Sequence, residues 1–372
     1  MLTGPDDSPW HQLPTTFDHV GTSDPRFFDR LWFAASDGDG RSCLQFTIGV
    51  YQNMNVVDGG FVVVRDGRQH NLRVSRQLRP RYETTVGPMA IEVIEPLTHL
   101  RLTVGPNDGS TAAQLDWRAT MPAQEENHHF RRRRGRVLED YARYDQIGSV
   151  SGWVDVDGDR VEIDDWWACR DHSWGVRERV GIPEPRTGED SPPSGSLFSF
   201  LFFSTATHGG HVQVGRHDGV GHLTAELTDI RTGETSRGRR VAMTAEFVDT
   251  GRPRRFSSAT FSVEQPDGTV IDLEVTARGP AVAMTGLGYG GYRDGLGLGV
   301  YRGRELHESE IWDVSHPAVV TYPDGRQDRP VHRIQPVRVV QRSSAGTSEG
   351  NGSLTFIAEV EVDEDGRLRE AG

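Results

Sequence analysis

The segment Ile163–Arg177, IDDWWACRDHSWGVR, holds the densest mixture of aromatic and ionisable side chains in the chain. A histidine such as His172 gives or takes a proton near neutral pH, and an indole such as Trp174 stabilises a developing positive charge. If the segment is a β-strand, its side chains alternate, so His172 shares a face with Trp174 while Asp171 points the other way. These residue types predict the wall of a pocket in which protons move. The alternative is a structural Arg–Asp–Trp cluster that ties the strand to its neighbours.

A second set of aromatic side chains can supply an apolar wall for such a pocket. The run 196–203 reads SLFSFLFF, and two tryptophans precede the histidine in the first segment. Aromatic runs in strands equally form ordinary hydrophobic core. The candidate wall residues are Trp166, Trp167, Phe198, Phe200, Phe202 and Phe203.

The glycine-rich segment Gly286–Gly299, GLGYGGYRDGLGLG, contains the spacing of a dinucleotide-binding loop. That motif needs a preceding strand, a following helix and a βαβ unit, whereas more glycine and strand-like sequence follow here. The segment therefore indicates a loop at the mouth of a barrel, with Tyr289 and Tyr292 available to a ligand, rather than a nucleotide site.

Four histidines, His208, His211, His217 and His222, lie close together in the sequence. The first two are three residues apart and can bind a metal where a strand bends, but no carboxylate or cysteine nearby completes a ligand set. We therefore expect them to be barrel-wall or loop histidines, and we expect no metal.

Composition excludes several classes of function. The chain has 372 residues, a net charge of −13 and no lysine, so all 41 basic residues are arginine. Lysine Schiff bases, pyridoxal phosphate chemistry and the P-loop lysine are thereby excluded, and the acidic balance disfavours nucleic acid. Two cysteines give no disulfide framework and fit a reducing cytoplasm, and no apolar stretch is long enough to span a membrane.

Short runs rich in Val, Ile, Thr, Phe and Leu between glycines and prolines predict an all-β protein with few short helices. Asp-Gly pairs, which two-residue hairpin turns prefer, occur at 66–67, 157–158, 267–268, 324–325 and 365–366. One segment near the start favours a short helix, because Asp24 can cap it, Pro25 suits its first turn, and Phe27, Phe28, Leu31 and Trp32 follow at helical spacing.

The proline-rich segment 181–195, GIPEPRTGEDSPPSG, is the best candidate for a linker and divides the chain roughly in half. We therefore expect two antiparallel β-domains of barrel or sandwich type, over residues 1–190 and 191–372.

The run 170–175, RDHSWG, followed by Arg177, resembles a bacterial lipocalin-like superfamily. That superfamily contains AttH-like proteins and carotenoid 1,2-hydratases, with tocopherol cyclase and kievitone hydratase as more distant relatives. Segments 87–102, 144–157 and 289–313 are similar to its uncharacterised actinobacterial branch. The resemblance implies two consecutive lipocalin-like antiparallel β-barrels, in agreement with the hairpin pattern.

The resemblance also implies an activity. The hydratases protonate an alkene in an apolar cavity and let water capture the cation, and their His-x-Trp pair matches His172 and Trp174. They carry a tyrosine and an aspartate two residues apart downstream, where this chain has the SLFSFLFF run instead. Asp171 is then the nearest acid, as partner of His172 or as proton donor, while Arg170 and Arg177 set the local field.

We therefore expect a cofactor-independent hydratase, cyclase or isomerase that acts on a hydrophobic isoprenoid or polyketide-like substrate. The alternative is a non-catalytic lipocalin-like carrier, which needs the cavity but not His172. We expect no nucleic acid partner and no integral membrane segment, and the number of subunits, a homo-oligomer included, is left open.

Overall fold

The computed structural model describes residues 2, 4–7, 9, 13–133, 135–181, 197–217, 220–292 and 294–358. Within these residues the chain is almost entirely β-structure, which confirms the expected fold class. The helices there are three short 3₁₀ turns: η1 (Gly4–Asp7), η2 (Gln52–Met54) and η3 (Met284–Leu287). None of the helices in the described part of the chain is long and apolar enough to cross a membrane.

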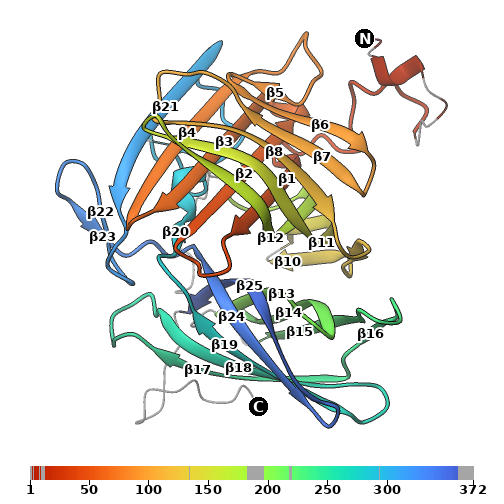
Figure 1. The fold of residues 1–372 in the computed structure, drawn as a ribbon. Helices are drawn as coiled ribbons and strands as arrows, with labels where there is room; N and C mark the ends of the chain where they lie inside the picture. The colour runs from red at the N-terminus through yellow and green to blue at the C-terminus, as the bar shows by residue number, and fades with distance from the viewer. Residues whose placement is uncertain are drawn as a thin grey trace.

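The strands form two curled antiparallel sheets, one of fifteen strands and one of ten (Figure 1). The first sheet contains β1 (Phe27–Ser36), β2 (Ser42–Tyr51), β3 (Val56–Arg65), β4 (Arg68–Gln77), β5 (Thr85–Val86), β6 (Met89–Glu95), β7 (His99–Val104), β8 (Thr111–Ala119), β9 (Gln124–Glu125), β10 (His129–Arg133), β11 (Arg136–Val156), β12 (Asp159–Val176), β21 (Glu305–Asp313), β22 (Val320–Thr321) and β23 (Gln327–Asp328). The second sheet contains β13 (Leu197–Thr205), β14 (His208–His217), β15 (Val220–Asp229), β16 (Thr235–Arg237), β17 (Arg240–Phe247), β18 (Phe256–Glu264), β19 (Val270–Ala277), β20 (Val282–Ala283), β24 (Arg333–Ser343) and β25 (Gly346–Ala358).

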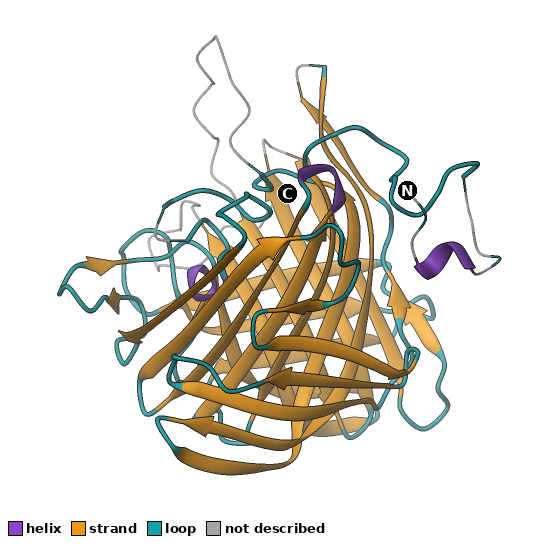
Figure 2. Cartoon of the chain, turned by 90° about the horizontal axis from the view of Figure 1, so that it is seen from above, coloured by secondary structure: helices purple, strands orange, loops and turns teal. Residues whose placement is uncertain are grey.

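The order of strands in the first sheet joins distant parts of the chain. The order runs β23-β22-β21-β4-β3-β2-β1-β12-β11-β8-β7-β6-β5. Strands β21–β23 thus belong to the first sheet, although in the sequence they lie between β20 and β24 of the second sheet. Figure 2 shows the strands of both sheets curling across the molecule with loops at their ends. The linker expected over 181–195 lies, after residue 181, outside the described residues, and the division at 190/191 stays a prediction.

The Asp-Gly pairs form the predicted two-residue hairpin turns at 66–67 and 157–158. The pairs at 267–268 and 324–325 lie in longer, five-residue hairpin loops, and the pair at 365–366 lies outside the described residues. At Asp157 and Gly158, between β11 and β12, both φ angles are positive, at 54° and 84°. Two consecutive residues with positive φ give the turn twist that a two-residue hairpin needs. These turns therefore set the register of the long hairpins.

The helix expected near the start of the chain is wrong, because Phe27–Ser36 form strand β1. This strand is buried on both faces: Phe33 packs in the core of the first sheet, and Trp32 packs against the second sheet. A strand covered on both sides has a nearly continuous apolar run, which periodicity alone does not distinguish from a helix.

Three large apolar clusters hold the two sheets in the described part of the chain, and a fourth, smaller one lies around Phe28 and Tyr51. One core fills the concave side of the first sheet around Phe46 and Trp117, and a second fills the second sheet around Phe203 and Phe261. The third lies between the sheets and joins Trp32, Phe200 and Phe202 with buried residues of η3 and β24. We call the first-sheet face that lines the first core its inner face, and the face turned to the second sheet its outer face.

The close approach of β8 to β11 depends on Gly148. A Cβ atom at this position would lie 2.3 Å from the carbonyl oxygen of Arg118 and 2.6 Å from the ring of Trp117. We expect Gly148→Ala to lower the free energy of unfolding in urea by about 1–3 kcal/mol, because a filled core has no room for the methyl group. Gly38→Ala is the control, since a Cβ there meets nothing within 4 Å and should change stability by less than about 0.5 kcal/mol. Equal stability of the two variants would contradict the close packing.

Candidate functional site

Strand β12 places the residues of the RDHSWG run on alternate faces of the first sheet. The strand lies between β1 and β11, with His172 opposite Leu31 on one side and Tyr144 on the other. Ala168 belongs to the inner core and Cys169 to the layer between the sheets, so residues with even numbers in this stretch face inward. Arg170, His172 and Trp174 therefore share the inner face, as the sequence predicts, and Asp171 lies on the outer face.

His172 has two polar partners, neither of which is Asp171. Its Nε2 lies 2.7 Å from Oδ1 of Asp29, and its Nδ1 lies 3.3 Å from the hydroxyl of Tyr144. Because a carboxylate only accepts hydrogen bonds, Nε2–H donates to Asp29, which leaves Nδ1 to accept from the Tyr144 hydroxyl. The partner role expected of Asp171 thus belongs to Asp29. The result is a chain from carboxylate to imidazole to phenol.

Aromatic faces surround this chain at an open end of the first sheet. The Trp174 ring lies 5.2 Å from the His172 ring, and Tyr144 lies 5.4 Å from it, both in edge-to-face arrangements. Trp174 is 39% exposed, so solvent and ligands reach the site. Burial raises the pKa of Tyr144, so its hydroxyl is protonated at neutral pH and can donate a hydrogen bond to His172.

Arg170 lies on the inner face of the first sheet, two residues before His172, and packs beside Tyr144. It is buried, donates to Oε1 of Gln146 at 2.7 and 3.0 Å, and stacks near the rings of Trp117 and Tyr144. Gln146 in turn donates to the carbonyl oxygens of Leu97 and Met121. The guanidinium therefore positions Tyr144 rather than facing a ligand.

The remaining predicted residues lie apart from His172. Trp166 packs against the inner core, and Tyr292 is buried on the loop before β21, where its hydroxyl donates to the carbonyl oxygen of Val74. The others lie between the sheets. These are Asp171, Arg177, Trp167, Phe200, Phe202 and Tyr289.

The group between the sheets joins its members by specific contacts. The Trp167 indole donates to Oγ of Ser204, and the rings of Phe200 and Phe202 lie 4.4 Å apart. Tyr289 accepts a hydrogen bond from Nε of Arg30. The Trp167–Ser204 hydrogen bond crosses from the first sheet to the second, and the Arg30–Tyr289 hydrogen bond joins the first sheet to the loop before β21. The group therefore helps to fasten the sheets together as well as lining the space between them.

A buried charged cluster that the sequence did not predict lies in the same layer. It contains Glu126, Arg143 and Asp145 from the first sheet and His211 from the second. Arg143 binds Glu126 with two hydrogen bonds of 2.8 and 2.9 Å, and His211 Nδ1 lies 3.5 Å from Asp145. The carboxylates missing from the sequence neighbourhood of His211 thus come from another sheet. His208 is not part of the cluster; its Nδ1 accepts a hydrogen bond from Gln341.

Protons rather than a metal ion suit this cluster. Glu126, Asp145 and His211 offer ligand atoms within 4.8 Å of one another, but the Arg143 guanidinium already occupies Glu126. Burial and the neighbouring Glu126 raise the pKa of Asp145 well above its ordinary value. Although burial opposes it, Arg143 and His129 hold the pKa of Glu126 well below. A protonated Asp145 that donates to ionised Glu126 satisfies both groups.

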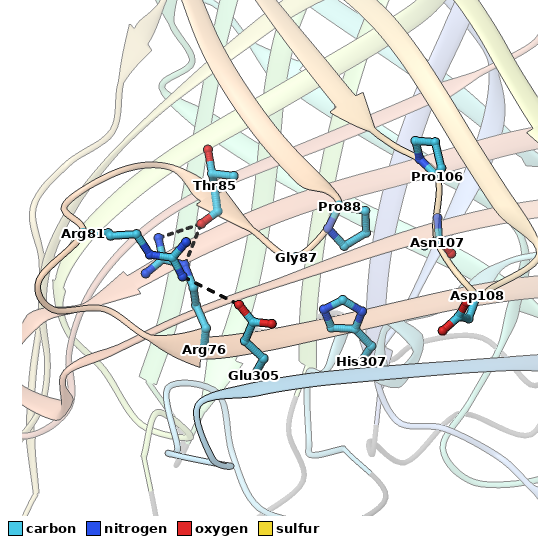
Figure 3. Close-up of a pocket in the computed structure, with 10 residues that line it drawn as sticks. All are labelled: Arg76, Arg81, Thr85, Gly87, Pro88, Pro106, Asn107, Asp108, Glu305 and His307. Carbon is cyan, nitrogen blue, oxygen red and sulfur yellow. Dashed lines mark hydrogen bonds and ion pairs between the residues drawn. The ribbon is translucent and has the colours of Figure 1, made fainter.

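Another pocket of the first sheet, which His172 does not line, has a polar and charged lining that does not suit an apolar substrate. It has a volume of about 440 Å³ and lies between the β4–β6 region and β21 (Figure 3). Figure 3 shows Arg81 reaching toward Glu305, and Arg76 is anchored by the carbonyl oxygen of Thr85 at 2.7 Å. Polar and charged side chains line it, and it holds none of the residues that the sequence singled out.

A model described as a family of unknown function, DUF8625, matches residues 2–350. The chain belongs to this family. No curated protein matches this DUF8625 member.

Solved structures resemble the chain over most of its length. CghA with Sch210972 has a TM-score of 0.51 at 10% identity and covers 90% of this chain and 89% of its own. CghA alone has the same TM-score and identity, with 90% and 88% covered. Kievitone hydratase from Nectria haematococca has a TM-score of 0.45 at 10% identity, with 92% and 93% covered. At this identity the likeness to CghA concerns the fold alone.

The Arg143 cluster makes a prediction about stability. We expect Arg143→Met to lower the free energy of unfolding by about 3–5 kcal/mol, because it leaves Glu126 charged and buried without its guanidinium partner. Arg342→Met, which breaks an exposed pair with Glu274, is the control and should cost less than about 1 kcal/mol. Urea unfolding at pH 7 measures both. An equal loss in the two variants would contradict the buried pairing.

The proton that Asp145 keeps and donates to Glu126 leads to a prediction about how stability depends on pH. A raised pKa in the folded state means that folded Asp145 keeps a proton that the unfolded chain has lost, so this residue makes stability fall as pH rises above about 4. Asp145→Asn keeps a donor to Glu126 but has no proton to release. From about pH 4 up to the raised pKa of folded Asp145, we expect the free energy of unfolding of the variant to rise relative to that of the wild type by up to about 1.4 kcal/mol for each pH unit. Parallel stability curves over this range would show that Asp145 is ionised in the folded protein.

Proposed function

We propose that this chain is a cofactor-independent enzyme that transfers protons on a hydrophobic, unsaturated substrate, as a hydratase, cyclase or isomerase. The observation that carries the proposal is the Asp29–His172–Tyr144 chain beside the exposed indole of Trp174. An acid–base group that is oriented by a carboxylate and flanked by aromatic faces suits proton transfer to and from an apolar substrate.

Each residue has a distinct part in this proposal. Asp29 fixes the tautomer and ring orientation of His172, as a carboxylate behind a catalytic imidazole does. His172 Nδ1 takes the Tyr144 proton or returns it, so the Tyr144 hydroxyl is the group that meets the substrate. In a hydration that starts with a proton on His172 Nδ1, the Tyr144 hydroxyl gives its proton to a carbon of the double bond while Nδ1 returns a proton to the Tyr144 oxygen. Water then adds to the resulting cation, and the proton that the water loses passes through Tyr144 back to His172 Nδ1. Trp174 faces the positive charge that develops in between.

The fold supports a small organic ligand. One CghA structure of this fold contains Sch210972, so the architecture accommodates a small molecule in at least one protein. The tyrosine and aspartate that the resemblance places downstream of His172 are absent there, but Tyr144 and Asp29 bring a phenol and a carboxylate to the same imidazole from other strands. We propose an isoprenoid or polyketide-like substrate, with Asp171, Arg177 and the aromatic residues between the sheets in supporting positions.

Substitution of the three groups tests the proposal. With unsaturated isoprenoids as substrates, we expect His172→Gln to lower turnover by about 10²- to 10⁴-fold, since it removes acid–base catalysis. Asp29→Asn and Tyr144→Phe should each lower turnover as well. Tyr144→Phe should do so without loss of affinity for the isoprenoid. Mass spectrometry measures a gain of one water, and chromatography resolves isomers of unchanged mass.

His128 supplies a matched control, because its Nε2 lies 2.7 Å from Oδ1 of Asp140 on the protein surface. His128→Gln should leave turnover unchanged. Full turnover in His172→Gln would overturn the site assignment. A wild-type protein that binds the isoprenoid and releases it unaltered would favour the alternative, a carrier.

A further inference from the structure

A second pocket lies at one end of the second sheet, away from His172. Its volume is about 270 Å³, near the lower end of the range for small-molecule sites. Strands β18, β19, β24 and β25 and the loops beside them form it. Its apolar lining consists of Val248, Phe256, Ala277, Ala281, Pro317 and Phe356.

Two buried arginines also line this pocket. Arg255 is 5% exposed and Arg333 is 2% exposed. Arg333 donates to the carbonyl oxygens of Pro317 and Ala281 at 3.0 and 2.9 Å. Arg255 donates to the carbonyl oxygens of Val331 and Phe356 at the longer distances of 3.3 and 3.4 Å. The Nε atom of each guanidinium is buried without a hydrogen-bond partner. Polar capacity therefore remains unused at both side chains.

These two cations have no counter-ion in the described part of the chain. Asp249 is the one acid whose charge acts on Arg255, but two hydrogen bonds of 2.7 and 3.0 Å commit it to Arg329. Burial and the neighbouring Arg333 and Arg329 lower the pKa of Arg255 to about 9, and burial lowers that of Arg333 to about 10. Both side chains are still charged at neutral pH, so positive charge lies buried and uncompensated beside a cavity.

Uncompensated buried charge is costly, and its position at a cavity indicates what can relieve the cost. A carboxylate accepts hydrogen bonds from two guanidinium groups at once, through geometry that guanidinium favours. The apolar lining around Phe256 and Phe356 suits a hydrocarbon chain attached to that carboxylate. A volume of 270 Å³ equals about nine water molecules in the liquid, which fits a chain of medium length.

We propose that this pocket binds a small amphipathic carboxylate, whose head group lies between Arg255 and Arg333 and whose hydrocarbon chain packs on the apolar lining. The site is separate from the proposed catalytic residues, because Asp29, His172 and Tyr144 belong to the first sheet.

Isothermal titration calorimetry of the full-length protein with octanoate tests this. We expect octanoate to bind at least tenfold more tightly than 1-octanol, which has the chain but not the charge, and octylamine to bind least. Arg255→Gln and Arg333→Gln should each weaken octanoate binding at least tenfold, while Arg255→Lys restores part of it. The control Arg342→Gln, an exposed arginine outside the pocket, should bind as the wild type does.

A second measurement does not depend on a variant that folds. Octanoate should raise the wild-type melting temperature more than 1-octanol at equal concentration, because a ligand that binds only the folded state stabilises it. Equal effects of octanoate and 1-octanol in both assays would overturn the proposal. His172→Gln should leave octanoate binding unchanged, so failure of the proposed catalytic site does not affect this test.

The chain carries its own carboxylates just beyond this pocket in sequence, since residues 359–372 are rich in Asp and Glu and follow Ala358. A full-length variant without these carboxylates distinguishes a free carboxylate ligand from the chain's own carboxylates. In this variant the acids are changed to the corresponding amides at Glu359, Glu361, Asp363, Glu364, Asp365 and Glu370. Equal octanoate affinity with and without these changes supports a free ligand. Binding that appears only in the amide variant would overturn the proposal in favour of the chain's own carboxylates.

Discussion

Burial of both faces over the central part of β1 and β12 is the constraint on which the rest of the structure depends. β12 pairs with β11 along nearly its whole length and with β1 over its second half, so it has no free edge there, and the inner face opens near Asp29 and Trp174. Side chains on one face fill the first core, and those on the other meet the second sheet. Each polar group on these strands must find a partner inside the protein, because water reaches few of them.

Arginine meets that demand in the layer between the sheets. Arg30 on β1 donates to Tyr51 at 2.5 Å, to Asp58 at 2.9 Å and to Tyr289 at 3.1 Å, and thereby joins three strands and the loop before β21. Arg143 on β11 likewise donates hydrogen bonds to Glu126, and its guanidinium lies over the Phe200 ring. A guanidinium group presents several donors in a fixed plane, which the single ammonium group of lysine does not. The absence of lysine from the chain agrees with this use of buried cations.

Local features of the fold were predictable from the sequence, and features that depend on strand order were not. The Asp-Gly turns and the alternation of His172 and Asp171 follow from neighbouring residues alone, and the structure has both. Strand β1 was not predicted, because burial on both faces removes the alternation that reveals a strand. Asp29 and Tyr144 lie 143 and 28 positions from His172, so no local pattern connects them. The place of β21 beside β4 is likewise set by tertiary packing.

The buried arginines fall into two groups that differ in what surrounds them. Arg30 and Arg143 lie in closely packed layers and have carboxylate partners, so their charge is balanced within the protein and fixes how the sheets meet. Arg255 and Arg333 lie beside a cavity and, within the described part of the chain, donate hydrogen bonds to carbonyl oxygens alone. A charge needed only to hold strands together has no reason to border an empty volume without a counter-ion, because the same strands can be held by apolar packing at lower cost. Arg30 and Arg143 are therefore cations that stabilise the fold, whereas Arg255 and Arg333 are the cations for which we propose an anionic ligand.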